Sequence, residues 1–377
     1  MRINGPSELV QDVQQAGVCI GCGACVELCP YFRYYNGRTL QVFSCDLESG
    51  RCFAHCPKIE VDLSELSQRL RGTAYQGLDI GVYRSVHASR AGGALPEASF
   101  QGGGTTSGIM AFALDSGMIE AAVLTDRDGL HPFPRITTKR EEVLACASSK
   151  FTAAPTLAAL NRAVRSGYRR LGVVGTPCQM TAVAQMKGNY TSKKDFHDPV
   201  ALSVGLFCNW ALDPRGLKQL LSTRVDLAGV TGMDIPPPPA DVLVVRMGAE
   251  TLEIPLDEIR TLIPETCSFC PDLTSEWADL SVGMFEGKPG WNTLIARTAE
   301  AEDLIREAEN AGYLVIEPMP EKNLEHLAGA GRAKKERAFS KAAQKGAVNS
   351  REKTSMLHIP SEALERFTSA PGCGAVH

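Results

Sequence analysis

The sequence has no run of 18 apolar residues, and its first residues, MRINGPSELVQDV, lack the apolar segment of a signal peptide. Because a membrane-spanning helix needs about 20 mostly apolar residues, we expect neither a membrane span nor secretion. The chain also lacks an excess of basic charge, since its net charge is −4, which gives no support for nucleic-acid binding. These absences favour a globular protein of the cytoplasm, either free or peripheral to a membrane complex.

Cysteine, in contrast, is abundant. The 377 residues include 13 cysteines, which is an odd number, and the cysteines are clustered along the chain. Without a signal peptide, this pattern indicates a reducing compartment and metal ligation rather than a disulfide framework. The length is sufficient for two or three domains.

The densest cysteine motif is Cys19–Pro30, CIGCGACVELCP. Its spacing is C-x2-C-x2-C-x3-C-P, with the ligands Cys19, Cys22, Cys25 and Cys29. This spacing is typical of one half of a bacterial ferredoxin that binds 4Fe–4S clusters. Gly21 and Gly23 allow the backbone to approach the cluster sulfides and to direct N–H groups at them. The alternative, a zinc ribbon, separates two cysteine pairs by about 12 to 20 residues, so the spacing favours iron and sulfur.

A second copy of this motif is incomplete. Cys52-x3-Cys56-Pro57 repeats the end of the first motif, but Glu48 stands where C-x2-C would place a cysteine after Cys45. In two-cluster ferredoxins the fourth cysteine of each motif binds the other cluster. This pairing defines a first thiol set for one complete cluster, Cys19, Cys22, Cys25 and Cys56, and a second thiol set that is one ligand short, Cys29, Cys45 and Cys52. Glu48 or Asp46, a three-iron cluster or a distant cysteine could complete the second set, and Glu48 could equally be a solvated loop carboxylate.

A third group of cysteines follows in the middle of the chain. Thr176 can cap a helix whose first residue is Pro177, so Cys178 falls in the first helical turn, where the macrodipole favours a thiolate. Cys208 ends the next predicted strand, at the same edge of a parallel sheet. With a C-x2-C pair further on, these residues form a third thiol set, Cys178, Cys208, Cys267 and Cys270. Four thiols suit zinc or 4Fe–4S, and the N-terminal motifs favour iron.

From residue 86 onward, predicted strands alternate with predicted helices. Strands are expected at SVHASRA, DVLVVRM and TLEIPL, and one helix is expected to begin at about Ser107. A second helix is expected near residue 140, where Thr138 and Glu141 could form a capping box. Such alternation predicts an α/β domain with a mixed or parallel sheet, and the whole chain is of the α+β or α/β class. Earlier, Asn36-Gly37 predicts a short hairpin.

The domain boundaries follow from these patterns. We predict a ferredoxin-like segment at 1–62, a linker at 63–85, an α/β domain at 86–330, and a basic C-terminal helix and tail at 331–377. The basic stretch that begins at Arg332 is interpreted as a solvated helix face, with a docking surface for an acidic partner as the alternative. Cys146 and Cys373 have no partners in these motifs and are interpreted as small hydrophobic residues.

The glycine-rich loop at 102–108 does not match G-x-G-x-x-G, because its last position is Ser107. A nicotinamide-binding Rossmann site is therefore unsupported. A glycine-rich loop that leads into a helix can still hold a phosphate or approach a flat ring.

Several stretches together resemble the beta subunits of coenzyme F420 (deazaflavin) hydrogenases and dehydrogenases. They are GGGTTSGIMAFALDSG, SSKFTAAP, GTPCQ, CSFCPDLTSEWADLSVG and GKPGWNTLIART, in the order of the family, from about residue 100 to 298. The ferredoxin-like segment extends the resemblance to nearly the whole chain. One departure is SKF in place of the family's SKY.

The resemblance implies an FAD in the α/β domain and a 4Fe–4S cluster on the third thiol set. It implies flavin contacts from the residues Gly102, Gly103, Gly104, Thr105, Thr106, Ser149, Lys150, Gly175, Thr176, Pro177, Lys288, Gly290, Asn292 and Thr293. Lys150 or Lys288, at the N1/C2-carbonyl edge of the flavin, would stabilise its reduced anion.

The function implied is that of an oxidoreductase subunit. It would pass electrons between clusters and a hydride carrier such as coenzyme F420, inside a hydrogenase, formate dehydrogenase or heterodisulfide-reductase-type complex of an anaerobe. Its partners would be catalytic or relay subunits, the hydride carrier or ferredoxin. The alternatives are a stand-alone ferredoxin-dependent reductase of an organic substrate and an iron–sulfur relay without flavin.

Overall fold

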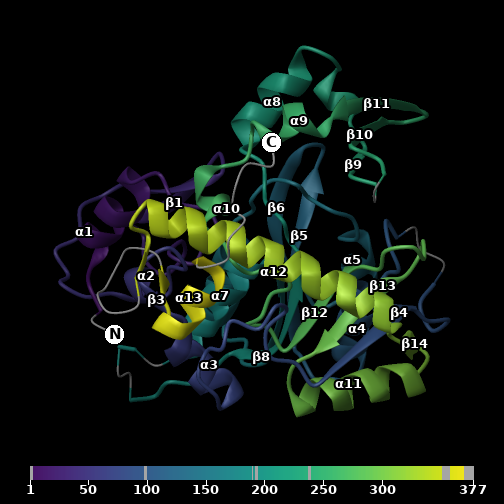
Figure 1. Cartoon of the computed structure of the whole chain (residues 1–377), viewed down its shortest axis with the longest axis horizontal. Coiled ribbons are helices and arrows are strands. Elements are labelled where there is room, and N and C mark those ends of the chain that lie inside the picture. Colours follow the sequence, from purple (N-terminus) through teal and green to yellow (C-terminus); the bar gives the residue numbers. More distant parts are fainter. Residues whose placement is uncertain are drawn as a thin grey trace.

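The centre of the computed structural model, which describes residues 3–96, 100–188, 190–191, 194–236, 239–349 and 357–368, is an eight-stranded sheet. The strand order is β14-β4-β13-β12-β8-β7-β5-β6 (Figure 1). In chain order these strands are β4 (Ser85–Ala91), β5 (Ala121–Asp128), β6 (His131–Thr137), β7 (Leu171–Gly175), β8 (Val200–Leu206), β12 (Leu280–Met284), β13 (Asn292–Ala296) and β14 (Leu314–Pro318). The four central strands run parallel, and the flanking strands pair antiparallel. The predicted mixed α/β architecture is confirmed.

Helices cover both faces of this sheet. In β5, Ala121 and Val123 pack against one face and Ala122 and Leu124 against the other, so the strand is apolar on both sides. One face is covered by α4 (Thr105–Asp115), α5 (Arg140–Ala145) and α11 (Ala299–Asn310). The other is covered by α3 (Leu63–Arg71), α6 (Thr156–Arg165) and α7 (Pro177–Met186). Helix α3 lies in the segment that was predicted as a linker.

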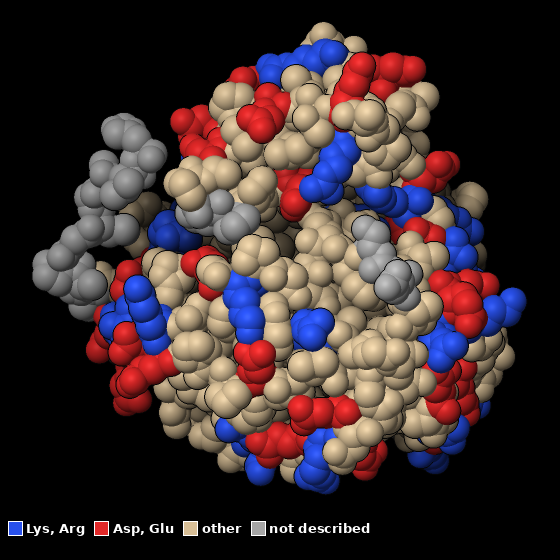
Figure 2. All heavy atoms as spheres, turned by 90° about the vertical axis from the view of Figure 1, so that its right-hand side faces the viewer, with Lys and Arg blue, Asp and Glu red and all other residues tan. Residues whose placement is uncertain are grey.

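A small lobe stands at one end of the sheet (Figure 1). It contains α8 (Pro214–Ser222), the 3-10 turn Leu227–Gly229, β9 (Gly232–Asp234), β10 (Val242–Met247), β11 (Glu250–Pro255) and α9 (Leu256–Arg260). The strands predicted at DVLVVRM and TLEIPL are confirmed as the antiparallel pair β10–β11. The lobe has its own apolar core, which includes Leu217, Leu243 and Ile254. Figure 2 shows the lobe above the body, with acidic and basic side chains interspersed over this face.

The N-terminal segment packs beside the lobe, since a Cβ atom at Gly37 would lie 2.7 Å from the ring of Pro214 at the start of α8. Its elements are α1 (Pro6–Leu9), a π-helical turn (Val10–Gln15), β1 (Phe32–Tyr35), β2 (Arg38–Gln41), α2 (Arg51–Ala54) and β3 (Val61–Asp62). The predicted hairpin is confirmed: β1 and β2 are antiparallel, and Asn36 and Gly37 have positive φ angles of 43° and 85°. Two successive residues with positive φ suit a tight hairpin turn.

The C-terminal part wraps back over the molecule. Its elements are the long helix α12 (Glu321–Gln344), β15 (Val348–Asn349), β16 (Leu357–His358) and α13 (Ser361–Thr368), whereas the short helix α10 (Glu265–Ser268) precedes β12. Helix α12 runs across the molecule from the N-terminal segment to β14 (Figure 1), and β16 pairs with β3. None of the helices in the described ranges has the length and apolar character of a membrane span.

Two local predictions are wrong. The basic stretch after Arg332 is not simply a solvated face, because Lys334 and Lys335 are only 5% and 1% exposed and bind buried oxygen atoms. The capping box at Thr138 and Glu141 does not form, since α5 begins at Arg140 with Lys139 as its N-cap and no side-chain cap.

Candidate functional site

The cysteine loop that follows residue 18 is docked on helix α6. The Leu157 amide donates to Cys22 O at 3.1 Å, and Asn161 Nδ2 donates to Ala24 O at 3.0 Å and to Val26 O at 2.7 Å. At Gly23, where φ is +83°, a Cβ atom would lie 2.8 Å from the backbone of α6. The loop can therefore reach the helix only with glycine at this position.

The four members of the first thiol set are neighbours. Burial raises the pKa of Cys22, and the Cys56, Cys25 and Cys19 thiolates raise it further. Burial also raises the pKa of Cys56 to about 12, with a contribution from Cys19. Such mutual effects require short separations, so these four thiols lie close together, although Cys52 of the second set also acts on Cys25. Cys19 Sγ also accepts the amide N–H groups of Gly21 and Thr39, each at 3.4 Å.

The second thiol set also gathers. Burial raises the pKa of Cys52 to about 11, and the Cys29 and Cys45 thiolates contribute. Asp46 and Glu48 are exposed. Their positions are those of solvated loop carboxylates, the simpler of the two interpretations of Glu48.

The third thiol set is built at the carboxyl ends of β7 and β8. Thr176 caps α7 in a box with Gln179, whose side chain accepts the Thr176 amide at 2.9 Å, and Pro177 is the first helical residue, as predicted. Cys178 is therefore in the first turn. Because β7 and β8 are parallel, Cys208 lies at the same edge.

Burial, rather than the helix dipole, is the largest influence on the pKa values of Cys178, Cys208 and Cys267. The pKa of Cys178 is raised to about 11 by burial, with contributions from Cys270 and Cys267, so the expected stabilisation of a thiolate is outweighed. Burial raises the pKa of Cys208 as well, and Cys178, Cys267 and Cys270 all contribute. The four predicted thiols are thus neighbours.

The glycine-rich loop lies against the start of β13. The Thr105 amide donates to Asn292 Oδ1 at 3.3 Å, and a Cβ atom at Gly103 would lie 2.7 Å from the same oxygen. Gly104 has φ +75°, and α4 begins at Thr105, two residues before the predicted start. Asn292 therefore joins two of the predicted flavin loops.

Ser149 and Lys150 lie beside this loop. The Ser149 amide donates to Gln101 Oε1 at 2.7 Å. Lys150 Nζ donates to Ser148 O at 3.0 Å and to Cys146 O, and burial lowers the pKa of Lys150 to about 8.

Cys146 is buried in the apolar core as expected, whereas Cys373 lies outside the described residues.

Lys288 and Thr293 are engaged within the protein. Lys288 Nζ pairs with the Glu317 carboxylate and lies 3.5 Å from the centroid of the Trp291 ring. The hydroxyl of Thr293 donates to Met284 O at 3.1 Å. Of the two lysines predicted as catalytic, Lys150 has only carbonyl oxygen atoms as its hydrogen-bond partners here.

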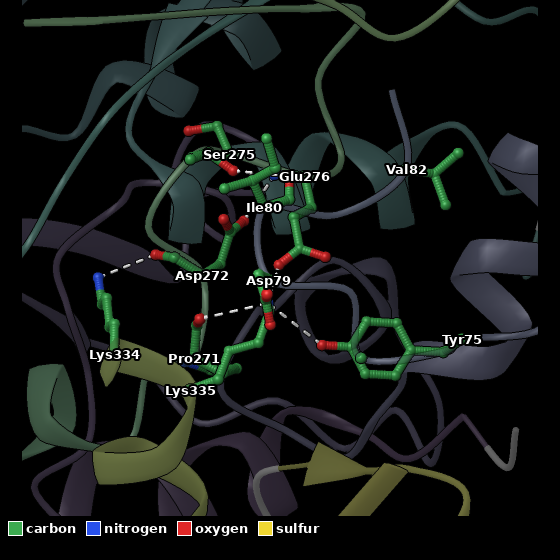
Figure 3. Close-up of polar contacts among 12 residues, drawn as sticks. Tyr75, Asp79, Ile80, Val82, Pro271, Asp272, Ser275, Glu276, Lys334 and Lys335 are labelled. Carbon is green, nitrogen blue, oxygen red and sulfur yellow. Dashed lines mark hydrogen bonds and ion pairs between the residues drawn. The ribbon is translucent and has the colours of Figure 1, made fainter. Parts of the chain in front are cut away.

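Sequence reasoning missed a buried polar network beside the third thiol set. Figure 3 shows Lys335, Tyr75 and Glu276 directed toward one another, with Asp272 and Lys334 nearby. Lys335 pairs with the Glu276 carboxylate and donates to the Tyr75 hydroxyl at 3.4 Å. No sequence signal distinguishes these lysines from their exposed neighbours, because their partners lie far away along the chain.

A cavity of about 40 Å³ separates this network from the cysteines. Its wall includes Lys58, Cys178, Cys270, Tyr75 and Asp272. Among the residues that the structure describes, no three candidate ligands surround a position for a single metal ion.

The fold and site define a mixed α/β protein in which three sets of thiols gather, an arrangement suited to electron transfer. Residues 92–161 match the family model of the N-terminal part of the coenzyme F420 hydrogenase/dehydrogenase beta subunit, and residues 168–322 match that of its C-terminal part. The two matches together cover more than half of the chain. The chain therefore belongs to this family, as its motifs indicated, and is an oxidoreductase electron-transfer subunit.

Individual relatives support this assignment. Coenzyme F420 hydrogenase subunit beta of Methanothermobacter thermautotrophicus is 28% identical over 64% of this chain and 87% of that protein. One of the subunits of the F(420)H(2) dehydrogenase of Methanosarcina mazei is 26% identical over 82% of this chain and 88% of that protein. A chain of the solved F420-reducing [NiFe] hydrogenase complex from Methanosarcina barkeri shares the fold, with a TM-score of 0.64, 24% identity and coverage of 71% of this chain and 93% of that chain.

Proposed function

We propose that this chain passes electrons between iron–sulfur clusters and a two-electron carrier of the coenzyme F420 type through FAD. The main support is spatial: the third thiol set gathers at the carboxyl edge of the sheet, and the first set is docked on the same body through α6. When bound, the clusters supply one-electron transfer and the FAD supplies hydride exchange.

The thiol sets suit iron–sulfur clusters by the chemistry of their donors. Cysteine thiolates are the usual ligands, and each binds its own iron in a cubane, which is compatible with the lack of a single-ion arrangement among the described residues. The amides of Gly21 and Thr39, which donate to Cys19 Sγ, stabilise negative charge on that sulfur.

The loops suit a flavin in a similar way. Gly102 is exposed and Gly103 is buried against Asn292, at the end of the sheet where α/β proteins bind ligands. Below a pH of about 8, Lys150 carries a positive charge that would stabilise a reduced, anionic ring. Its role is to orient and stabilise, since the redox chemistry belongs to the cofactor.

We further propose that a redox partner subunit contacts the N-terminal segment near Cys45. Large apolar side chains are exposed around this cysteine, at Tyr35, Leu40, Val42, Phe43 and Leu47. Apolar patches of this kind mark interaction surfaces. The names of the relatives, which are subunits of hydrogenase and dehydrogenase enzymes, support such a partner.

The test uses the anaerobically purified chain and its Cys178→Ala variant. We expect about one FAD and about eight to twelve irons per parent chain. In the variant, hydride exchange with coenzyme F420 should persist, while reduction of a one-electron dye through the first thiol set should slow by orders of magnitude in stopped-flow measurements. Iron near four per chain together with bound zinc would contradict the third cluster.

Cys146→Ala is the matched control. Cys146 is buried but belongs to none of the thiol sets, so its loss should change neither reaction. If Cys178→Ala reduces the dye at the parent rate, the clusters do not act in series and the proposal is wrong.

A further inference from the structure

Lys58 is a buried lysine that connects the N-terminal segment with the α/β body. Its side chain is 5% exposed, and Nζ donates to Thr266 O at 3.2 Å. Lys58 follows Cys56 of the first thiol set by two residues, while Thr266 directly precedes Cys267 of the third set. One ammonium group therefore lies where ligands of two different sets approach each other.

The cavity beside the third thiol set agrees with this placement. Lys58 lines this cavity together with Cys178 and Cys270, and along the chain it lies two residues from Cys56 of the first set. Its charge thus acts on both sides of the contact between the two sets.

Lys334 offers an internal comparison. It is equally buried, and its Nζ donates to Cys208 O and, at 2.9 Å, to Asp272 O. Cys208 is a member of the third set, and Asp272 follows its Cys270 by two residues. Lys58 is thus a buried lysine shared between two sets, whereas Lys334 is directed at a single set.

A buried positive charge favours an added electron on a neighbouring cluster. In the low-dielectric interior the attraction between the two charges is strong and poorly screened by salt. Nearby charge and burial are among the factors by which a protein controls cluster potentials. A cation between two clusters raises both potentials together.

We propose that Lys58 is a positioning residue that raises the reduction potentials of the first and third clusters together, so that both accept an electron more readily while the difference between their potentials changes little. This inference rests on the proposed function. The transfer oxidises one cluster by one electron and reduces the other by one, and no proton is exchanged. Lys58 contributes charge and touches neither flavin nor substrate.

The experiment is an anaerobic redox titration of the loaded, full-length chain, followed by EPR spectroscopy. The signals are assigned with Cys56→Ser and Cys178→Ala. Lys58→Met should lower both midpoint potentials, each by about tenfold in the equilibrium between oxidised and reduced forms, which is about 59 mV for one electron. Lys334→Met should lower only that of the third cluster. Lys58→Arg should keep both midpoint potentials at the parental values. The exposed control Lys139→Met should change neither potential.

Unchanged potentials in Lys58→Met, at parental iron content, would overturn the inference and leave the proposed function intact. Lys58→Gln provides a second neutral variant that retains a donor for Thr266 O. Loss of iron from both neutral variants, with retention in Lys58→Arg, would make Lys58 a structural tie and would also overturn the inference. A parent chain without iron would instead contradict the proposed function.

Discussion

At the scale of single residues, Lys150 is the candidate flavin-site group that titrates closest to neutral pH. Burial lowers its pKa to about 8, against an ordinary value of about 10.4. The positive charge is present below about pH 8 and is lost as the pH rises through this value. Between about pH 8 and 10.4 the unfolded chain binds more protons than the folded chain, so the contribution of Lys150 to folding stability rises with pH in this window.

We therefore expect hydride exchange to fall above about pH 8 while the fold remains stable. Lys150→Arg should remove this fall because the arginine stays charged, and Lys150→Met should slow exchange about tenfold to a thousandfold at pH 7. The measurement is the stopped-flow rate of hydride exchange between pH 6 and about 10. Lys139→Met is the control, since Lys139 is exposed and is not among the predicted flavin contacts. An unchanged pH profile in Lys150→Arg would exclude this role.

At the scale of elements, the contact between the cysteine loop and α6 depends on the absence of one side chain. A Cβ atom at Gly23 would lie 2.8 Å from both Ala158 N and Pro155 O, which are backbone atoms that cannot turn away. Backbone carbonyl groups of the loop accept from the Leu157 amide and from the Asn161 side chain, so a small outward shift breaks several hydrogen bonds at once.

Gly23→Ala should consequently destabilise the chain by about 1–3 kcal/mol and release iron from the first thiol set. Gly17→Ala is a matched control, because Gly17 also has a positive φ of +74° but has no atom within 4 Å of its Cβ position. The free energy of unfolding in urea and the iron content per chain are measured for both variants. Equal losses in the two would show that backbone strain, and not the clash with α6, is responsible.

At the scale of the whole molecule, α12 fastens the separate parts together. Its buried Phe339 and Ala342 pack in the same core as α6 and α7, and Phe367 of α13 joins them. Lys335 pairs with Glu276 at the centre of this contact. Burial opposes the charge of both partners and raises the pKa of Glu276, while the Glu276 carboxylate raises the pKa of Lys335.

Glu276→Ala should destabilise the protein by about 3–5 kcal/mol, because it leaves a buried ammonium group without a counter-ion. The double variant Glu276→Met with Lys335→Met should be much closer to the parent, since it removes both charges and retains volume. Urea unfolding of the three proteins tests this. A double variant as unstable as the single one would mean that the ion pair is not the source of the loss.

The prediction of the fold succeeded where short-range signals are strong. The hairpin at Asn36-Gly37, the cap at Thr176 and strand β4 each depend on a few adjacent residues, and all three were predictable. The capping box at Thr138 failed, because the hydroxyl of Thr137 instead accepts the Lys139 amide at 3.0 Å.

Local sequence was thus sufficient for the cysteine motifs, the alternation of strands and helices, and the turns, because spacing and backbone preference act within a few residues. Long-range contacts settle which charged groups are buried and what they face. Lys58 meets Thr266 across 208 residues, and Lys335 meets Glu276 across 59. A lysine enters the interior only where distant oxygen atoms compensate for its lost hydration, and those distant partners exist only once the chain is folded.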